Sequence, residues 1–386
     1  MKPKIVLHLL IVFCICISCK PKQRIEKIND LTILHLQGSP YERGLAHGKF
    51  LKKEIEIIVS RWEKEVEMAY QSDFKSAIAS FFINTNFLNE IKKQSPDILE
   101  EVRGIANGCN IDYETILAYQ LSEEIDALSN EIKGSHCTSI SINSTDNNPT
   151  FLAQNMDPPL FLHGFPTLLH ITEKENGIQS YVYTIPGFIG LNGMNSKGIG
   201  ITCNGISMLN HANSGLPISF IVRKVLQQKN EGDAFAFIEK IPIGVPQCFT
   251  IGGKNEARCY ECSTNQKTQF FPFEKKNITL HTNFSIANRD FNQQFIDLLK
   301  QYGKSVNDSY YCPRYFLAYD KIIEANYNLN YQTIKNILSL AKPEIEPISN
   351  ENTYGCLVME LSHSPILYIS PGKPSEKEFI KLTFEN

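Results

Sequence analysis

The chain has 386 residues, of which 42% are hydrophobic and 20% are charged, and its formal net charge at pH 7 is −3. This composition is ordinary for a globular protein, and the length suffices for one large domain or two small ones. No block of basic residues lies beyond the N-terminus, so nucleic acid is not expected as a partner.

The N-terminus has the pattern of an export signal. Lys2 and Lys4 precede an apolar run over residues 5–17, and Ser18-Cys19 follow it. This order is typical of a secretion signal, and the run is short for a transmembrane helix. Residues 1–19 resemble a bacterial lipoprotein signal, in which Cys19 would be lipidated and become the mature N-terminus. We expect an exported protein, either anchored to a membrane through Cys19 or periplasmic or extracellular; a plain cleaved signal or a short anchor is the alternative.

The first third of the mature chain is predicted to be mainly helical. The charged residues 20–30 read as a flexible tether, and residues 31–36 alternate as a strand does. Amphipathic patterns then predict helices over residues 41–70, 73–87, 96–107 and 113–128. Gly44 and Gly48 share one helical face, which indicates close packing against a neighbour, and Gly108 is expected to cap the third helix.

Strands dominate the prediction after Gly134, with helices between them. The expected strands are residues 137–142, 150–154, 168–173, 179–185, 190–195, 198–204, 247–251, 257–262, 268–272, 353–360, 366–370 and 378–383. The expected helices are residues 218–228, 233–240, 290–302, 313–325 and 331–340. This order predicts an α+β chain, and a four-layer αββα sandwich would accommodate it.

One cysteine stands at the start of this strand-rich part. Cys137 follows Gly134-Ser135-His136, and twenty residues later Asp157 ends the next predicted strand. If the chain cut itself before Cys137, the cysteine would carry a thiol nucleophile and an α-amine base on one residue. The reference pKa values, about 8.5 for the thiol and about 7.7–8.0 for the amine, allow this proton transfer near neutral pH. The alternative is a buried strand cysteine, since free cysteine is often buried.

The remaining cysteines indicate neither a disulfide framework nor a metal site. Cys259 and Cys262 form a single CxxC pair with no second pair and no nearby histidine. We therefore interpret them as strand residues, and we expect no metal and no organic cofactor.

Several stretches, in the same order along the chain, resemble the penicillin acyltransferase family. This is the family of acyl-coenzyme A:6-aminopenicillanic acid acyltransferases, a branch of the N-terminal nucleophile hydrolases related to choloylglycine hydrolase and penicillin V acylase. The matching stretches are residues 35–44, 47–48, 101–108, 137–138, 154–157, 190–195, 281–283 and 372–374.

The resemblance implies one αββα domain over residues 31–386. It also implies self-cleavage between His136 and Cys137, giving a helical α-chain up to residue 136 and a catalytic β-chain over residues 137–386 that stay associated. The family more often has glycine before the nucleophile, so His136 is a departure.

The resemblance also implies roles for individual residues. Cys137 would be the nucleophile, and Asp157 would bind the new α-amine and hold it as a base. Asn283 matches the asparagine that stabilises the oxyanion, and Asn204 matches a second active-site asparagine. Arg314 matches an arginine that supports the nucleophile in the choloylglycine relatives.

Two departures from related enzymes bear on these roles. Bile salt hydrolases have an arginine three residues before the acid, where this chain has Gln154. The penicillin acyltransferases have a catalytic arginine near the last strands, whereas residues 349–353 contain none. The bile salt pattern therefore fits less well than the acyltransferase pattern. The sequence leaves open which residue would supply the positive charge that an arginine supplies in the related enzymes.

The expected function is that of a self-processing cysteine amidohydrolase or acyltransferase. It would act on the C–N amide bond of a small N-acyl compound through an acyl-enzyme, with substrate choice set near residues 161–165 and Phe188. The alternatives are a catalytically silent surface lipoprotein that binds ligands or partners, and a cell-wall peptidase. A papain-like pairing of Cys137 with His136 or His281 is disfavoured, because no papain-type signature surrounds the cysteine.

Overall fold

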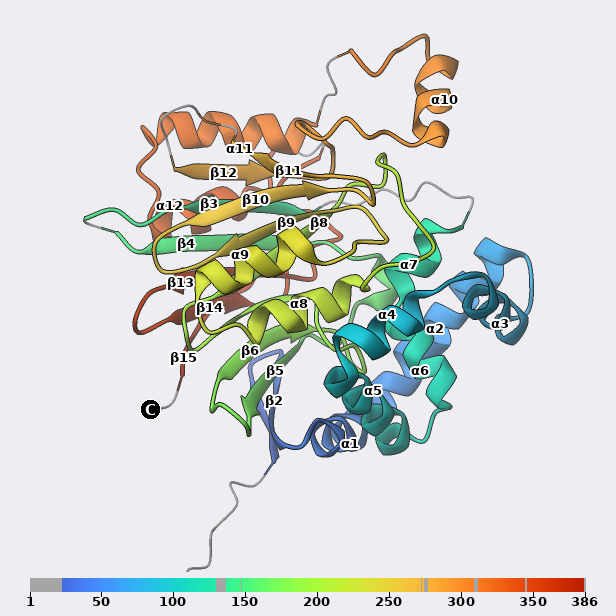
Figure 1. Ribbon diagram of the computed structural model, residues 1–386. Helices are drawn as coiled ribbons and strands as arrows, with labels where there is room; N and C mark the ends of the chain where they lie inside the picture. The colour runs from blue at the N-terminus through green and yellow to red at the C-terminus, as the bar shows by residue number, and fades with distance from the viewer. Residues whose placement is uncertain are drawn as a thin grey trace, which may run out of the picture.

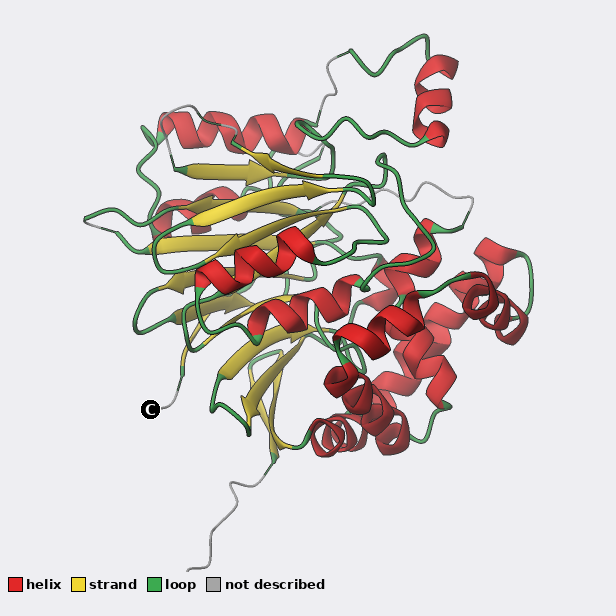
Figure 2. Cartoon of the chain, in the orientation of Figure 1, coloured by secondary structure: helices red, strands yellow, loops and turns green. Residues whose placement is uncertain are grey.

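The computed structural model describes residues 23–129, 137–146, 148–271, 273, 277–308, 312–343 and 346–384. The described strands form a nine-stranded and a six-stranded sheet that face each other, with helices on the outer faces (Figures 1 and 2). The predicted α+β class and its αββα layering are confirmed. Cys19 and His136 lie outside the described residues.

The start of the described chain differs from the prediction. β1 (Arg24–Ile28) pairs antiparallel with β2 (Leu31–Gly38), so part of the segment expected to be a tether is an edge strand. The charged residues that suggested a tether fit an edge strand, because one side of such a strand faces solvent. None of the helices in the described ranges is both long and apolar enough to cross a membrane.

The helices before Cys137 follow the prediction with more breaks. They are α1 (Pro40–Phe50), α2 (Lys52–Tyr70), α3 (Phe74–Asn84), α4 (Phe87–Gln94), α5 (Pro96–Cys109), α6 (Tyr113–Gln120) and α7 (Ser122–Ala127). The helix expected over residues 41–70 is two helices, because Leu51 leaves the helical conformation (φ −115°, ψ 26°) while it is buried in the core. The cap of α5 is Asn110 in the left-handed conformation, not Gly108 as predicted.

Helices α1 and α5 pack backbone to backbone through glycines. A Cβ atom added to Gly44 or Gly48 would overlap the backbone of α5, at Glu101 and Ile105 respectively. Gly104 and Gly108 of α5 present the same restriction toward α1. The close packing inferred from Gly44 and Gly48 is thus confirmed.

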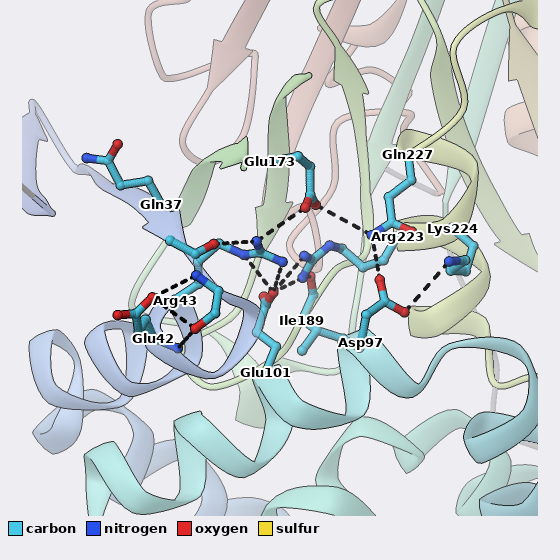
Figure 3. A network of polar contacts seen from close by, with 12 residues as sticks. Gln37, Glu42, Arg43, Asp97, Glu101, Glu173, Ile189, Arg223, Lys224 and Gln227 are labelled. Carbon is cyan, nitrogen blue, oxygen red and sulfur yellow. Dashed lines mark hydrogen bonds and ion pairs between the residues drawn. The ribbon is translucent and has the colours of Figure 1, made fainter. Parts of the chain in front are cut away.

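A buried ion-pair network joins these helices to the larger sheet (Figure 3). Glu101 accepts from Arg43 Nε at 3.1 Å and from Arg223 Nη1 and Nη2 at 2.6 and 2.9 Å. Arg43 Nη1 also lies 3.2 Å from Glu173 Oε2, at the end of β5 (Thr167–Glu173). Arg223 belongs to α8 (Ile218–Leu226), so the network ties α1, α5 and α8 to the sheet.

The larger sheet has the order β1-β2-β5-β6-β7-β8-β9-β10-β11. Its remaining strands are β6 (Gln179–Thr184), β7 (Asn192–Asn195), β8 (Gly200–Gly205), β9 (Gln247–Gly252), β10 (Ala257–Cys262) and β11 (Lys267–Phe270). Its outer face carries α8, which contacts β7 and β8, and α9 (Glu231–Lys240), which contacts β9. Cys259 and Cys262 lie in β10, as expected for strand residues.

The smaller sheet has the order β12-β3-β4-β13-β14-β15. Its strands are β3 (Thr138–Ile142), β4 (Thr150–Met156), β12 (Ile278–His281), β13 (Gly355–Leu361), β14 (Ile366–Ser370) and β15 (Ile380–Thr383). The helices that follow β12 are α10 (Gln293–Gln301), α11 (Pro313–Glu324) and α12 (Tyr331–Leu338). β12 was not predicted, because a run of four residues gives little signal even though its side chains alternate between apolar and polar. β3 and β4 pack against β8 and β9, so the two sheets contact each other through these strands.

Candidate active site

Cys137 and Asp157 lie together at one end of the smaller sheet. β3 begins at Thr138, β4 ends at Met156, and Thr138 pairs with Asn155 in an antiparallel register. This register places Cys137 and Asp157 side by side, and the backbone N–H of Asp157 lies 3.5 Å from the Cys137 sulfur. Both residues are buried, at 7% and 4% exposure. The pairing of thiol and acid expected from the sequence is thus present in the fold.

Burial changes the proton affinity of both groups. It raises the pKa of the Cys137 thiol to about 12, and the charge of Asp157 adds to this effect. It also raises the pKa of Asp157 to about 7, although a hydrogen bond from Asn350 and the charge of Arg314 oppose the change. A thiol with such a pKa is protonated at neutral pH, so it needs a nearby base before it can act as a nucleophile.

Arg314, in the first turn of α11, connects Cys137 to Asn283. Its Nη1 donates to the backbone oxygen of Cys137 at 2.8 Å and to Thr138 Oγ1 at 3.0 Å. Its Nη2 donates to Asn283 Oδ1 at 3.3 Å, and Asn283 Nδ2 donates to the Gly205 oxygen at 3.1 Å. The fold therefore brings Cys137, Asp157, Asn283 and Arg314 into one cluster.

Glu261 of β10 fixes the loop that carries Asn283. Its carboxylate accepts from the Ser285 hydroxyl and from three consecutive backbone N–H groups, those of residues 286–288, at 2.7–2.9 Å. His281 Nε2 lies 2.9 Å from the same carboxylate, and its Nδ1 lies 2.8 Å from the Thr282 oxygen. Both ring nitrogens of His281 are thus engaged away from Cys137, which argues against a papain-like pair. No pattern in the sequence indicates this role for Glu261, because its partners in the loop lie 24–27 residues further along the chain.

Asn204, like Asn283 and Arg314, is not among the described residues that line the cavity beside Cys137. Its Oδ1 lies 3.4 Å from Gln154 Nε2, between the two sheets, and its buried Nδ2 has no hydrogen-bond partner among the described residues. Its neighbours Cys203 and Gly205 line the cavity beside Cys137, whereas Asn204 is not among the described lining residues. The structure therefore does not bring the Asn204 side chain to the wall of the cavity.

The two departures noted in the sequence have structural counterparts. Gln154 Nε2 donates to the Cys203 oxygen at 2.5 Å, and its Oε1 accepts from Asn192 Nδ2 at 2.9 Å, so Gln154 links the two sheets. The stretch 349–353, which has no arginine, supplies Asn350, whose Nδ2 donates to Asp157 Oδ2 at 2.7 Å. Asn350 was not predicted as a site residue, because only an arginine was expected to act from this stretch.

A cavity of about 160 Å³ opens beside Cys137 and Asp157. Its apolar lining includes Trp62 of α2, Phe161 and Phe188, and the last two come from the segments expected to set substrate choice. Among the described residues, no group of three or more His, Cys, Asp or Glu side chains could hold a metal ion. The arrangement offers a buried thiol, an acid next to it and a small apolar chamber, which suits acyl transfer.

A comparison with protein families shows which family part of this chain matches. Residues 144–307 match the family described as acyl-coenzyme A:6-aminopenicillanic acid acyl-transferase. The resemblance stated from the sequence is thereby confirmed over these residues, which include Asp157, Asn204 and Asn283 but neither Cys137 nor Arg314.

The individual related proteins have low sequence identity to this chain. Proteins dcd1B and dcd1A of Dictyostelium discoideum are 25% and 26% identical to this chain over 226 and 228 residues, 52% of it in each case. An uncharacterized protein of Archaeoglobus fulgidus is 24% identical over 249 residues, 58% of this chain. These matches span 44%, 50% and 41% of the three relatives, about half of their length or less.

Similar solved structures include two hydrolases. A mutant of the conjugated bile acid hydrolase from Clostridium perfringens is 13% identical, with a TM-score of 0.39 over 65% of this chain and 97% of that one. Penicillin V acylase from Agrobacterium tumefaciens is 12% identical, with a TM-score of 0.40 over 64% of this chain and 86% of that one.

Proposed function

We propose that the protein is a cysteine N-terminal nucleophile amidohydrolase or acyltransferase that acts on a small N-acyl compound. The observation that carries this proposal is the Cys137 thiol beside Asp157 at the wall of a cavity, with Arg314 joining Cys137 to Asn283. The match of residues 144–307 to an acyltransferase family supports the reaction class. A protein that only binds a ligand would not need a thiol, a carboxyl group, an amide and a guanidinium group buried together in this way.

Processing would create the catalytic base. In our proposal the Cys137 thiol attacks the carbonyl of His136, and the amide nitrogen leaves as the α-amine of Cys137. Water then hydrolyses the thioester and releases a new carboxylate at His136. Asp157 lies next to the site of the new amine and would hold it in place by a hydrogen bond, and its carboxylate would raise the affinity of the neutral amine for a proton.

The same cysteine would then act on substrate. The α-amine takes the thiol proton, and the thiolate attacks the amide carbonyl to form a tetrahedral oxyanion. An N–H group of Asn283 would donate to this oxyanion, and a fixed donor of this kind typically lowers the barrier by about 3–4 kcal/mol. The leaving amine receives the proton, and water or an acceptor amine takes the acyl group from the thioester. Hydrolysis is the proposed outcome, since an exported enzyme meets water and little coenzyme A.

Export and anchoring are part of the same proposal. The sequence of residues 1–19 supports a lipoprotein signal with the lipid on Cys19. Cells that express the protein and incorporate an alkyne-labelled fatty acid would show the label on the wild type and lose it in Cys19→Ser. Label on neither protein, or on both, would contradict a lipid at Cys19.

The processing proposal is tested by the intact mass of the purified protein. Wild type is expected as two associated fragments, the larger beginning at Cys137, while Cys137→Ala stays one chain and has no activity. Cys109→Ala, which changes a buried cysteine of α5 that is not among the described residues lining the cavity, is the control and should be processed. A wild type that stays uncut would favour the silent surface lipoprotein, and full activity of Cys137→Ala would exclude the mechanism.

A further inference from the structure

One carboxylate holds the chain on both sides of Asn283. Asn283 follows β12, and the register of β12 with β3 brings it level with Cys137. On the N-terminal side of Asn283, the Nε2 atom of His281 lies 2.9 Å from Glu261 Oε1. On its C-terminal side, the backbone N–H groups of residues 286–288 donate to the same carboxylate at 2.7–2.8 Å. Glu261 therefore fixes the place of Asn283 from both directions along the chain.

The loop around Glu261 has the form of an anion-binding site. Three successive backbone N–H groups, those of residues 286–288, converge on one carboxylate, and such an arrangement favours a negative charge. Glu261 is fully buried, and burial alone would raise its pKa, but the hydrogen bond and charge of His281 and the backbone N–H groups lower it. The loop conformation therefore depends on this carboxylate, because a carboxamide in its place would turn an NH₂ group toward N–H donors.

The carboxylate also joins the two sheets at this end of the fold. Glu261 lies in β10 of the larger sheet, while the loop that it holds follows β12 of the smaller sheet. Asn283 Nδ2 donates to the oxygen of Gly205, at the end of β8 in the larger sheet. Gly205 and Cys137 both line the cavity. A shift of the loop relative to the larger sheet would therefore move the Asn283 amide relative to the thiol.

We infer that Glu261 is a positioning residue for the reaction, whose carboxylate holds the Asn283 amide where the oxyanion forms on attack by Cys137. This inference rests on the proposed function, because it acts through the oxyanion role proposed for Asn283. A hydrogen-bond donor stabilises the developing charge only from the right place, and a displacement of about 1 Å can cost on the order of 10²-fold in rate. The effect falls on kcat more than on KM, since Glu261 is not among the described residues that line the cavity.

Steady-state kinetics of Glu261→Gln measures the effect. The variant keeps the size of the side chain but loses the carboxylate, so kcat is expected to fall about 10- to 50-fold and KM to change less than about threefold. The substrates are the p-nitroanilides of phenylacetic, hexanoic and decanoic acid, and the one that processed wild type hydrolyses fastest serves for every variant. Glu256→Gln, between β9 and β10 with a side chain that is 38% exposed, is the control and should keep the wild-type kcat.

A double-mutant cycle with Asn283→Ala separates positioning from a general effect on stability. Asn283→Ala alone is expected to lower kcat about 10²- to 10³-fold. If Glu261 acts through Asn283, adding Glu261→Gln to that variant lowers kcat by less than about threefold more, because the amide that it positions is already gone. A further loss as large as that of Glu261→Gln in the wild-type background would overturn the inference, and so would an unchanged kcat in Glu261→Gln itself.

A milder variant, Ser285→Ala, gives the same test if Glu261→Gln does not fold. The Ser285 hydroxyl donates to Glu261 Oε2 at 2.9 Å, and its removal leaves the other donors to the carboxylate in place. We expect kcat to fall about 3- to 10-fold, and this loss to disappear in Ser285→Ala/Asn283→Ala. Equal losses in both backgrounds would overturn the inference. Processed wild type that hydrolyses none of the amides would contradict the proposed function and the inference with it, whereas an active wild type with additive variants would overturn the inference alone.

Discussion

In the described part of the chain, the buried carboxyl groups of Glu101 and Asp157 lie in two clusters whose neighbours leave them in opposite states. Burial alone would raise the pKa of Glu101, but Arg223 and Arg43 outweigh it and lower the pKa to about 2. Burial also acts on Asp157, where an amide from Asn350 is the main opposing group, and here the pKa rises to about 7. The two guanidinium groups in direct contact with Glu101 thus keep its carboxylate charged, while Asp157 can exchange its proton near neutral pH.

The comparison separates a cluster that supports the fold from the cluster proposed as the active site. Both oxygens of Glu101 are engaged by arginine side chains, and the network joins helices to a sheet (Figure 3). Asp157 instead has an Oδ1 without a hydrogen-bond partner among the described residues, and it lies at a cavity next to a thiol. A titratable group with a raised pKa in a cavity is typical of a site of chemistry, and a saturated ion network is typical of a support.

The largest expected effect is on activity, from Asp157→Asn. The amide keeps the shape of the acid but cannot hold the α-amine of Cys137 as a base, so kcat/KM should fall on the order of 10³-fold. Amide hydrolysis by the purified variant, with far-UV circular dichroism to confirm folding, measures this. Asp320→Asn, on the exposed side of α11, is the control. A loss below about tenfold would show that Asp157 is not part of the reaction.

The second effect is on stability, from Glu101→Gln. Removing the carboxylate leaves Arg43 and Arg223 buried without their counter-charge, and breaking a buried pair in this way costs about 3–5 kcal/mol. Urea unfolding measures the change, and Glu100→Gln, whose side chain is 52% exposed, should shift the unfolding free energy little. Activity per folded molecule should stay near that of the wild type, since the network is separate from the cluster at Cys137. An unchanged midpoint of unfolding would contradict a supporting role.

The two clusters also differ in how far the sequence could predict them. Cys137 and Asp157 were found because each sits at the end of a patterned strand, and antiparallel pairing brings such ends together. Asn350 lies 193 residues from Asp157, and no local pattern indicates a hydrogen bond over that separation. The same limit applies to Glu101 and Arg223, which are 122 residues apart and meet only after the helices pack. Most elements and the layers were predictable from the sequence pattern, with β1 and β12 as exceptions, but the tertiary partners of side chains were not.

A third prediction concerns the arginine that joins Cys137 to Asn283. Arg314→Lys keeps the charge but loses the planar fork that reaches Cys137 O and Asn283 Oδ1 together, so kcat should fall about 10- to 100-fold. Steady-state kinetics on one amide measures kcat and KM separately, and KM should change less because Arg314 is not among the described residues lining the cavity. Arg103→Lys, in an exposed pair with Glu100, is the control. A variant with unchanged kcat would remove Arg314 from the site.

The smallest effect is a pH dependence that distinguishes the uncut chain from the processed one. In Cys137→Ala, which keeps the peptide bond, Asp157 has a folded-state pKa of about 7 against an unfolded value of about 3.9, so the folded chain binds the proton more tightly. This stabilising contribution is complete below about pH 4 and is lost as the pH rises through 7, so stability should fall by about 1 kcal/mol per pH unit between pH 5 and pH 6.5.

The difference in unfolding free energy between Cys137→Ala and Cys137→Ala/Asp157→Asn isolates the contribution of Asp157, because the contributions of Glu101 and the other carboxyl groups cancel. Processing places an ammonium beside Asp157 and lowers its pKa, so the difference in unfolding free energy between processed wild type and processed Asp157→Asn should be nearly flat over this range. A flat difference in the uncut chain would mean that Asp157 is charged before processing, as Glu101 is, and the contrast between the two clusters would no longer hold.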